Sequence, residues 1–169
     1  LVAGTGASTM AVYTHFDGMP GLWRAVRQEG FTRLAAELAA VSPTRDPVRD
    51  LAAYGCAYVR NGLAHPDLYR LMFDTEAELE DAAAADASFA VLIRAADRAR
   101  ADGRLDASSD PADVATRLWV FGHGLVSLTN AGVLPRAALD DHSVAGTAAV
   151  LVAAGDDPKR CTRSVAAGW

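Results

Sequence analysis

The sequence lacks the features that mark disulfide-rich, zinc-binding, membrane or exported proteins. It has only two cysteines, Cys56 and Cys161, which are too few for a disulfide framework and too far apart for a zinc motif. We therefore expect two free thiols. No stretch approaches the roughly 20 uninterrupted apolar residues of a membrane helix, and the N-terminus lacks the charged-then-apolar layout of a signal peptide. These absences predict a cytoplasmic protein.

Basic residues are outnumbered, and signals for β-strands are weak. The 16 Lys and Arg residues stand against 21 Asp and Glu, which gives a formal net charge of -5. Because nonspecific DNA binding depends on clustered basic side chains that release counterions, any contact with DNA is expected to be local. Val and Ile form no alternating runs, whereas 51% of the residues are hydrophobic and Ala and Leu dominate. The composition predicts an all-α fold with one main core.

Caps and apolar spacing place the expected helices. Ser, Asp or Pro stands at most of the expected starts and Gly at several of the ends. The run before Ser88 could be a loose helix or a loop, and the helix from Pro111 is apolar on nearly its whole circumference, which predicts burial on several sides. Residues 156–169 look like a polar tail that is mobile or packed against a neighbour. The expected helices span about 9–16, 20–40, 47–62, 66–73, 88–103, 111–131 and 142–154.

The most informative segment runs from Thr5 to Phe16. It combines a glycine that permits a tight turn, a serine that can cap a short helix, and an aromatic pair at the end of that helix. In a helix-turn-helix motif, such a helix points its first side chains and the positive end of its dipole at the DNA major groove. The alternative is a capped helix whose aromatic residues only anchor a core. The segment resembles the signature of the tetracycline-repressor (TetR) family, which it matches at Gly6, Ser8, Tyr13, His15 and Phe16, and conservatively at Ala7 and Val12.

This resemblance implies that residues 1–40 are the C-terminal part of a DNA-binding domain, with a recognition helix and a linker helix. The first helices of that domain are expected upstream, because the sequence opens on Leu1 and not on Met. Two positions depart from the family pattern: Gly18-Met19-Pro20 replaces the usual Ser-Lys-Glu, which removes a phosphate-binding lysine, and Ala11 replaces a threonine. The residues that the resemblance assigns to DNA contact are Ser8, Thr9, Met10, Tyr13, Thr14 and His15.

Two further segments resemble one C-terminal class of the same family. Residues 118–128 contain Trp119, His123 and Gly124 in the order of its tryptophan-histidine-glycine signature, and residues 65–73 are also similar to that class. The resemblance implies that residues 41–155 bind a ligand and form a homodimer through the last two expected helices, with residues 156–169 as a tail. The residues expected at the dimer interface are Phe121, Leu125, Leu128, Val150 and Leu151.

Aromatic residues are the candidates for lining a ligand pocket. Small-molecule sites are mostly apolar with a few polar groups, and Gly122 and Gly124 would let a helix or a ligand come close. Each aromatic residue alone is more often part of a plain core, and a lone buried histidine is more often a hydrogen-bonded core residue than a ligand contact. We nevertheless predict that at least two of the candidates line a pocket. The candidates are Tyr54, Tyr58, Phe73, Phe89, Trp119 and His123.

Catalytic patterns are missing from the sequence. It has no glycine-rich phosphate loop, His-Glu-x-x-His motif, Glu-x-x-His pair or nucleophile elbow, and its four histidines are too dispersed to hold a metal. We expect no enzyme activity, cofactor or metal. The predicted function is that of a homodimeric repressor that binds a palindromic DNA operator and is released by a small apolar or aromatic effector. The alternative is a helical ligand-binding or scaffolding dimer without DNA recognition, which the acidic balance and Gly18-Met19-Pro20 favour.

Overall fold

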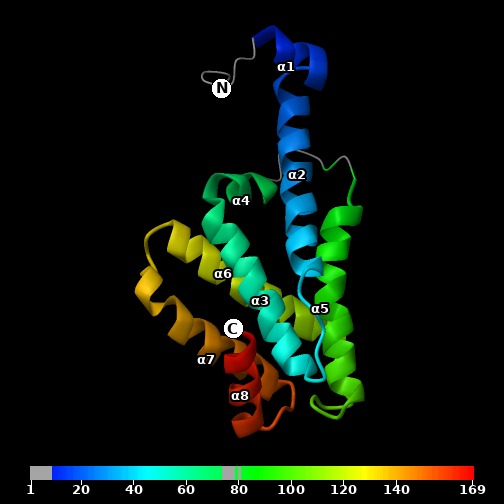
Figure 1. Ribbon diagram of the computed structural model, residues 1–169, viewed down its shortest axis with the longest axis vertical. Coiled ribbons are helices and arrows are strands. Elements are labelled where there is room, and N and C mark those ends of the chain that lie inside the picture. The colour runs from blue at the N-terminus through cyan, green and yellow to red at the C-terminus, as the bar shows by residue number, and fades with distance from the viewer. Residues whose placement is uncertain (1–8, 74–78, 80) are drawn as a thin grey trace.

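The computed structural model describes residues 9–73, 79 and 81–169, and every regular element in this part of the chain is helical. The prediction of an all-α fold is confirmed. Helix α1 (Thr9–Phe16) leads into the long helix α2 (Met19–Ala39). The two residues between them, Asp17 and Gly18, have positive φ angles of 54° and 89°, so the chain turns sharply there. Figure 1 shows α1 at the far end of α2, away from the rest of the molecule.

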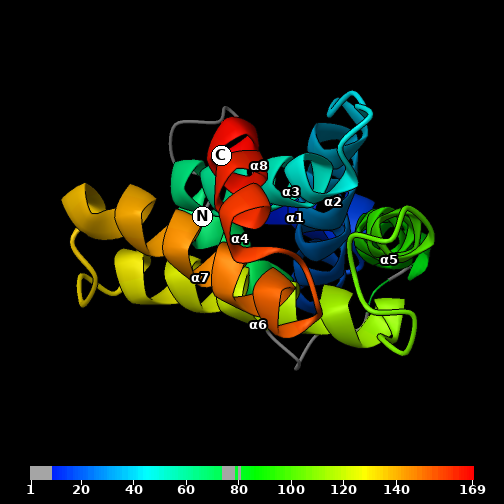
Figure 2. The same cartoon turned by 90° about the horizontal axis from the view of Figure 1, so that it is seen from below.

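The remaining helices form the body of the protein. The second half of α2 packs on α3 and α5. Helix α6 packs on α3, α5 and α7. The short helix α4 lies against α2, and α8 lies against α3 and α7. Figure 2 looks at the body from below, with α5 seen end-on and α6 and α7 side by side. The bounds are α3 (Pro47–Ala64), α4 (Pro66–Met72), α5 (Ala83–Ala101), α6 (Pro111–Asn130), α7 (Leu139–Ala153) and α8 (Pro158–Gly168).

Local caps explain where several helices begin. The Asp46 carboxylate accepts hydrogen bonds from the first free amides of α3, and the Asp110 carboxylate accepts one from the first turn of α6. In both helices proline follows the cap, where its missing N–H costs no hydrogen bond. The predicted starts at Pro47 and Pro111 are therefore confirmed. Helix α5 begins earlier than Ser88 because Asp81 accepts a hydrogen bond from the amide of Ala83. Residues 74–78 and 80, within the run whose structure was left open, lie outside the described residues.

The expected tail is instead the ordered helix α8, which corrects that prediction. Asp157 caps it by accepting a hydrogen bond from the amide of Arg160. Its inner face consists of Cys161, Ser164 and Val165, which are buried. Its Asp157-Pro158 start carries the same signal as the starts of α3 and α6, so the helix was readable from the sequence and was overlooked.

Arg104 holds α8 in place through a buried polar network. Its side chain is 1% exposed and forms two parallel hydrogen bonds with the Asp156 carboxylate, at 2.9 and 2.8 Å. The same guanidinium donates to Asp46 at 2.7 Å and to the Ser164 hydroxyl at 3.1 Å. Because Asp46 also caps α3, the network joins the starts of α3 and α8.

Helix α6 packs on α3, α5 and α7, so it is buried on several sides as predicted, but one of its faces is uncovered. Val120 and Leu128 are 60% and 49% exposed, because no described helix of the same chain covers that face. The inner face of α6 is buried as expected, with Val126 fully enclosed. No described helix is both long and apolar enough to cross a membrane.

Candidate ligand-binding cavity

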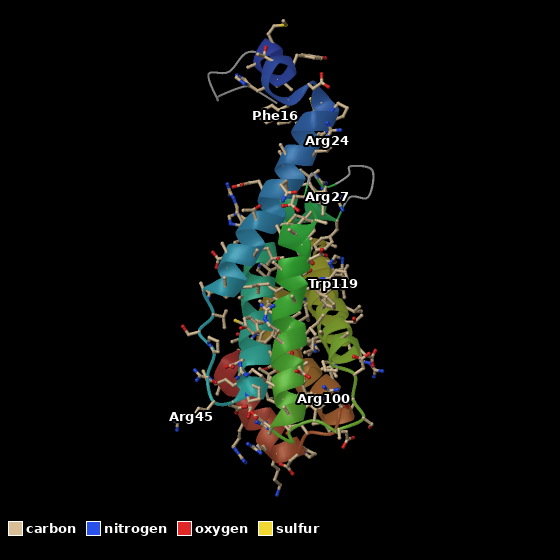
Figure 3. The ribbon with its side chains drawn as sticks, turned by 90° about the vertical axis from the view of Figure 1, so that its right-hand side faces the viewer. Phe16, Arg24, Arg27, Arg45, Arg100 and Trp119 are labelled. Carbon is tan, nitrogen blue, oxygen red and sulfur yellow. The ribbon has the colours of Figure 1, made fainter. Side chains whose placement is uncertain are left out.

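A cavity of about 490 Å³ lies between α2, α3, α5 and α6. Its walls are mainly aliphatic and aromatic, and among the residues that the structure describes, two charged side chains line it, Arg27 and Asp86, which have opposite signs. Figure 3 shows Arg27 on the upper part of α2 and Trp119 lower down, beside α5. A largely apolar space of this size has the usual properties of a small-molecule site.

Five of the six predicted ligand-contact residues line this cavity, namely Tyr54, Tyr58, Phe73, Phe89 and Trp119. The Phe89 and Trp119 rings approach edge to face, with centroids 6.0 Å apart. The sixth predicted residue, His123, does not line the cavity, but it contacts the hydroxyl of Tyr58, which does. Gly122 also lines the cavity: a Cβ there would lie only 3.4 Å from the Tyr58 ring, so the glycine accommodates a close approach as expected.

Tyr58, Tyr69 and His123 form a hydrogen-bonded cluster at this wall. The two tyrosine hydroxyls are 2.7 Å apart, and the Tyr69 hydroxyl lies 2.7 Å from Nδ1 of His123. Burial raises the pKa of Tyr58 to about 12 and also raises the pKa of Tyr69. Burial lowers the pKa of His123 below its ordinary value of 6.5. All three groups are therefore uncharged at neutral pH, and Tyr58 brings a neutral hydroxyl to an otherwise apolar wall.

Sequence reasoning missed two parts of the cavity. The first is the wall from α2, formed by Phe31, Leu34 and Leu38, whose helical spacing was visible but reads the same for a plain core. The second is Trp169, which follows α8; its ring lies 3.0 Å from the position that a Cβ on Gly55 would take. Nothing near Trp169 in the sequence indicates that it returns to α3.

The predicted DNA-contact residues lie on or before α1. Met10 and Tyr13 are 69% and 65% exposed, and Thr14 and His15 are exposed as well. The Thr14 hydroxyl donates to the main-chain oxygen of Met10 at 3.0 Å. Ser8 and the side chain of Thr9 lie outside the described residues. Helix α1 thus presents side chains on the outside of the molecule, at the opposite end from α8 (Figure 1).

The predicted dimer residues divide into two groups. Leu125 and Leu151 are 6% and 0% exposed within one chain, so they have almost no surface to give to a partner. Phe121 and Val150 are half-buried, and Leu128 is exposed. The Phe121 ring fills the space left by Gly146 on α7, which brings α6 and α7 close together.

Comparison with known proteins identifies the family. The model of the family described as "Tetracyclin repressor-like, C-terminal domain" matches residues 51–165, so the chain belongs to this family of regulators. A solved structure described as a protein with unknown function from Rhodococcus sp. RHA1 is similar in fold, with a TM-score of 0.77 and 25% sequence identity. The similarity covers 92% of this chain and 82% of that one. No curated protein matches the chain.

Proposed function

We propose that this chain belongs to a homodimeric transcriptional repressor that binds a DNA operator through α1 and releases it when an apolar or aromatic effector enters the cavity. The observation that carries this proposal is the double role of α2. One end of α2 carries α1, and the other end forms a wall of the cavity through Phe31, Leu34 and Leu38. A ligand that contacts this wall therefore acts on the helix that positions α1.

Contacts between α2 and α4 support the same coupling. The Arg27 Nε donates to the main-chain oxygen of Met72 at 2.9 Å. A Cβ on Gly30 would lie 2.9 Å from the sulfur of Met72, so α4 fits against α2 with no room for a side chain there. Phe73, the next residue after α4, lines the cavity. A ligand that contacts Phe73 would therefore also act on α2, through α4.

Helix α1 has the features of a DNA-reading helix. Tyr13 and Met10 are large side chains left exposed, and the described part of α1 carries no acidic residue that would repel phosphate. Tyr13 and His15 are the proposed phosphate contacts, and Met10 and Thr14 the proposed contacts to bases or backbone.

The proposed dimer forms through the uncovered faces of α6 and α7. Val120, Gly124 and Leu128 are spaced four residues apart on α6, and a Cβ on Gly124 would have open space around it. Ala145 and Ala149 on α7 are small and exposed. Two copies that pair through these faces would form a four-helix bundle and hold two α1 helices for two operator half-sites.

A gel-shift assay of the full gene product on its own promoter, at low and moderate salt, tests this function. We expect specific binding whose affinity falls steeply with salt, with a logarithmic slope of roughly -0.9 per phosphate contacted. Tyr13→Ala should weaken binding, whereas Thr162→Ala on α8, at the other end of the molecule, should not. Unchanged affinity and operator preference in Tyr13→Ala would contradict the role of α1.

The second candidate function is a ligand-binding or scaffolding dimer without DNA recognition. Gly18-Met19-Pro20, where the family usually has a lysine, and the net charge of -5 favour it. This candidate predicts normal ligand binding and no salt-sensitive affinity for the promoter at any concentration tested.

A further inference from the structure

The wall of the cavity next to α8 is a single indole ring. Trp169 lines the cavity, and its Cζ3 atom lies 3.0 Å from the position of a Cβ on Gly55. A side chain at residue 55 would collide with this ring, so the glycine in α3 provides the space that the ring occupies. At the next residue back, Gly168, an added Cβ would overlap the main-chain oxygen of Arg49. Two glycines therefore allow the end of α8 to lie directly on α3.

Hydrogen bonds fix the backbone that carries this ring. The Arg49 Nε donates to the main-chain oxygen of Ala167 at 3.2 Å, and the Cys56 thiol donates to the main-chain oxygen of Trp169 at 3.0 Å. The start of α8 is held by Asp156, which binds Arg104, and Arg104 also binds Asp46 at the start of α3. Because α8 is tied to α3 at both ends, the indole is a fixed part of the cavity wall.

We propose that Trp169 determines which ligands the cavity accepts, by closing it at the α3–α8 side and limiting the length of the bound molecule. This inference rests on the proposed ligand-binding function. The lining residues on α2 run from Arg27 to Leu38, a helical rise of about 16 Å, so the cavity suits an elongated molecule. The described lining is largely apolar, and the two charged side chains within it are opposite in sign, so the proposed ligand class is an uncharged aromatic or hydrocarbon-rich molecule with few polar groups.

The test measures how ligand length affects affinity in the intact protein. The fluorescent probe N-phenylnaphthylamine, which is uncharged and aromatic, is bound first and then displaced by para-alkylphenols of increasing chain length. In the wild type, affinity should rise roughly fourfold per added methylene group until the cavity is filled, and then stop rising. Trp169→Ala should move this limit to chains at least two methylene groups longer, and Trp169→Phe should move it less.

Trp23→Ala is the matched control, because Trp23 is 37% exposed on α2 and does not line the cavity. This control should keep the wild-type limit. Circular dichroism and the monomer–dimer ratio show whether each variant is folded, and Trp169→Phe retains a ring to hold α8 in place if Trp169→Ala loosens it.

The failures of the two proposals can be distinguished. If the wild type binds the probe and the alkylphenols but Trp169→Ala and Trp169→Phe keep the wild-type limit, the role of Trp169 is refuted and the ligand-binding function stands. If the folded wild type binds neither the probe nor any alkylphenol, the ligand-binding function is refuted, and this inference with it.

Discussion

The Tyr69 hydroxyl lies 2.7 Å from Nδ1 of His123, so the two groups are hydrogen-bonded behind the cavity wall. A tyrosine hydroxyl can donate to Nδ1 only when that nitrogen carries no proton. Burial acts in the same direction, because it lowers the pKa of His123. Tyr69 can then accept a hydrogen bond from Tyr58, whose hydroxyl lies 2.7 Å away. Neutral His123 thus keeps its place in the hydrogen-bonded cluster with Tyr58 and Tyr69.

The stability of the protein should depend on the charge of His123. The unfolded chain binds a proton at His123 near the ordinary pKa of 6.5, whereas the folded protein resists it. Between these two pKa values the unfolded state holds more protons, so the free energy of unfolding rises with pH and is lost as pH falls below about 6.5. Comparing urea unfolding of the wild type and His123→Gln from pH 8 to pH 5 tests this. We expect the difference between them to level off above about pH 7.5 and to change below it. Parallel curves over the whole range would contradict the prediction.

Arg104 should contribute far more to stability than an exposed arginine. Arg104→Met would leave the carboxylate of Asp156 buried without its partner, which costs about 3–5 kcal/mol. Arg33→Met is the matched control, since Arg33 and Glu29 are 55% and 53% exposed and such helical pairs contribute at most about 0.5 kcal/mol. Denaturant unfolding of both variants gives the comparison. Equal losses would show that the Arg104 network does not anchor α8.

The helices could be predicted where their signals are local. Asp46 and Asp110 cap the residues that directly follow them, so the starts of α3 and α6 could be located from short segments. Helix α8 begins with the same Asp-Pro signal, at Asp157 and Pro158, so its start was equally readable from a short segment and was overlooked. The contact that holds α8 against the body was not readable, because Arg104 and its partner Asp156 are 52 residues apart in sequence. A buried ion pair between distant segments leaves no periodic pattern for sequence reasoning to use.

The candidate site was predicted in part for a similar reason. The aromatic residues around Tyr58 and Trp119 were found because large rings on several helices meet in the interior of a helical protein. Leu34 was missed as a cavity residue because its spacing is the same whether it faces a cavity or another side chain. The buried Leu125 and Leu151 were grouped with the exposed Leu128 because periodicity alone does not separate the inner from the outer face of a helix that is apolar nearly all round.

A charge on the uncovered face of α6 should separate the proposed dimer. Val120 is 60% exposed in the single chain, and Val120→Glu would place a carboxylate against a second copy. We expect the dimer dissociation constant to rise at least tenfold, which corresponds to about 1.4 kcal/mol. Ala36→Glu, which adds the same charge to an exposed position of α2, should leave the dimer unchanged. Sedimentation velocity over a range of concentrations measures both, and an unaltered dimer in Val120→Glu would place the interface elsewhere.

Ligand and DNA should weaken each other's binding by the same factor. The effector acts on Phe31, Leu34 and Leu38 of α2, and DNA acts on α1 at the other end of that helix, so both bias one conformational equilibrium of α2. Couplings of this kind are about 1–3 kcal/mol, or roughly 5- to 150-fold in affinity. Titrating N-phenylnaphthylamine with and without promoter DNA, and labelled DNA with and without the probe, gives the two factors. Tyr13→Ala should reduce DNA affinity and leave probe affinity in the absence of DNA unchanged. Because linkage between two binding equilibria is always reciprocal, a factor of one in both titrations is the result that would contradict a link between the cavity and α1.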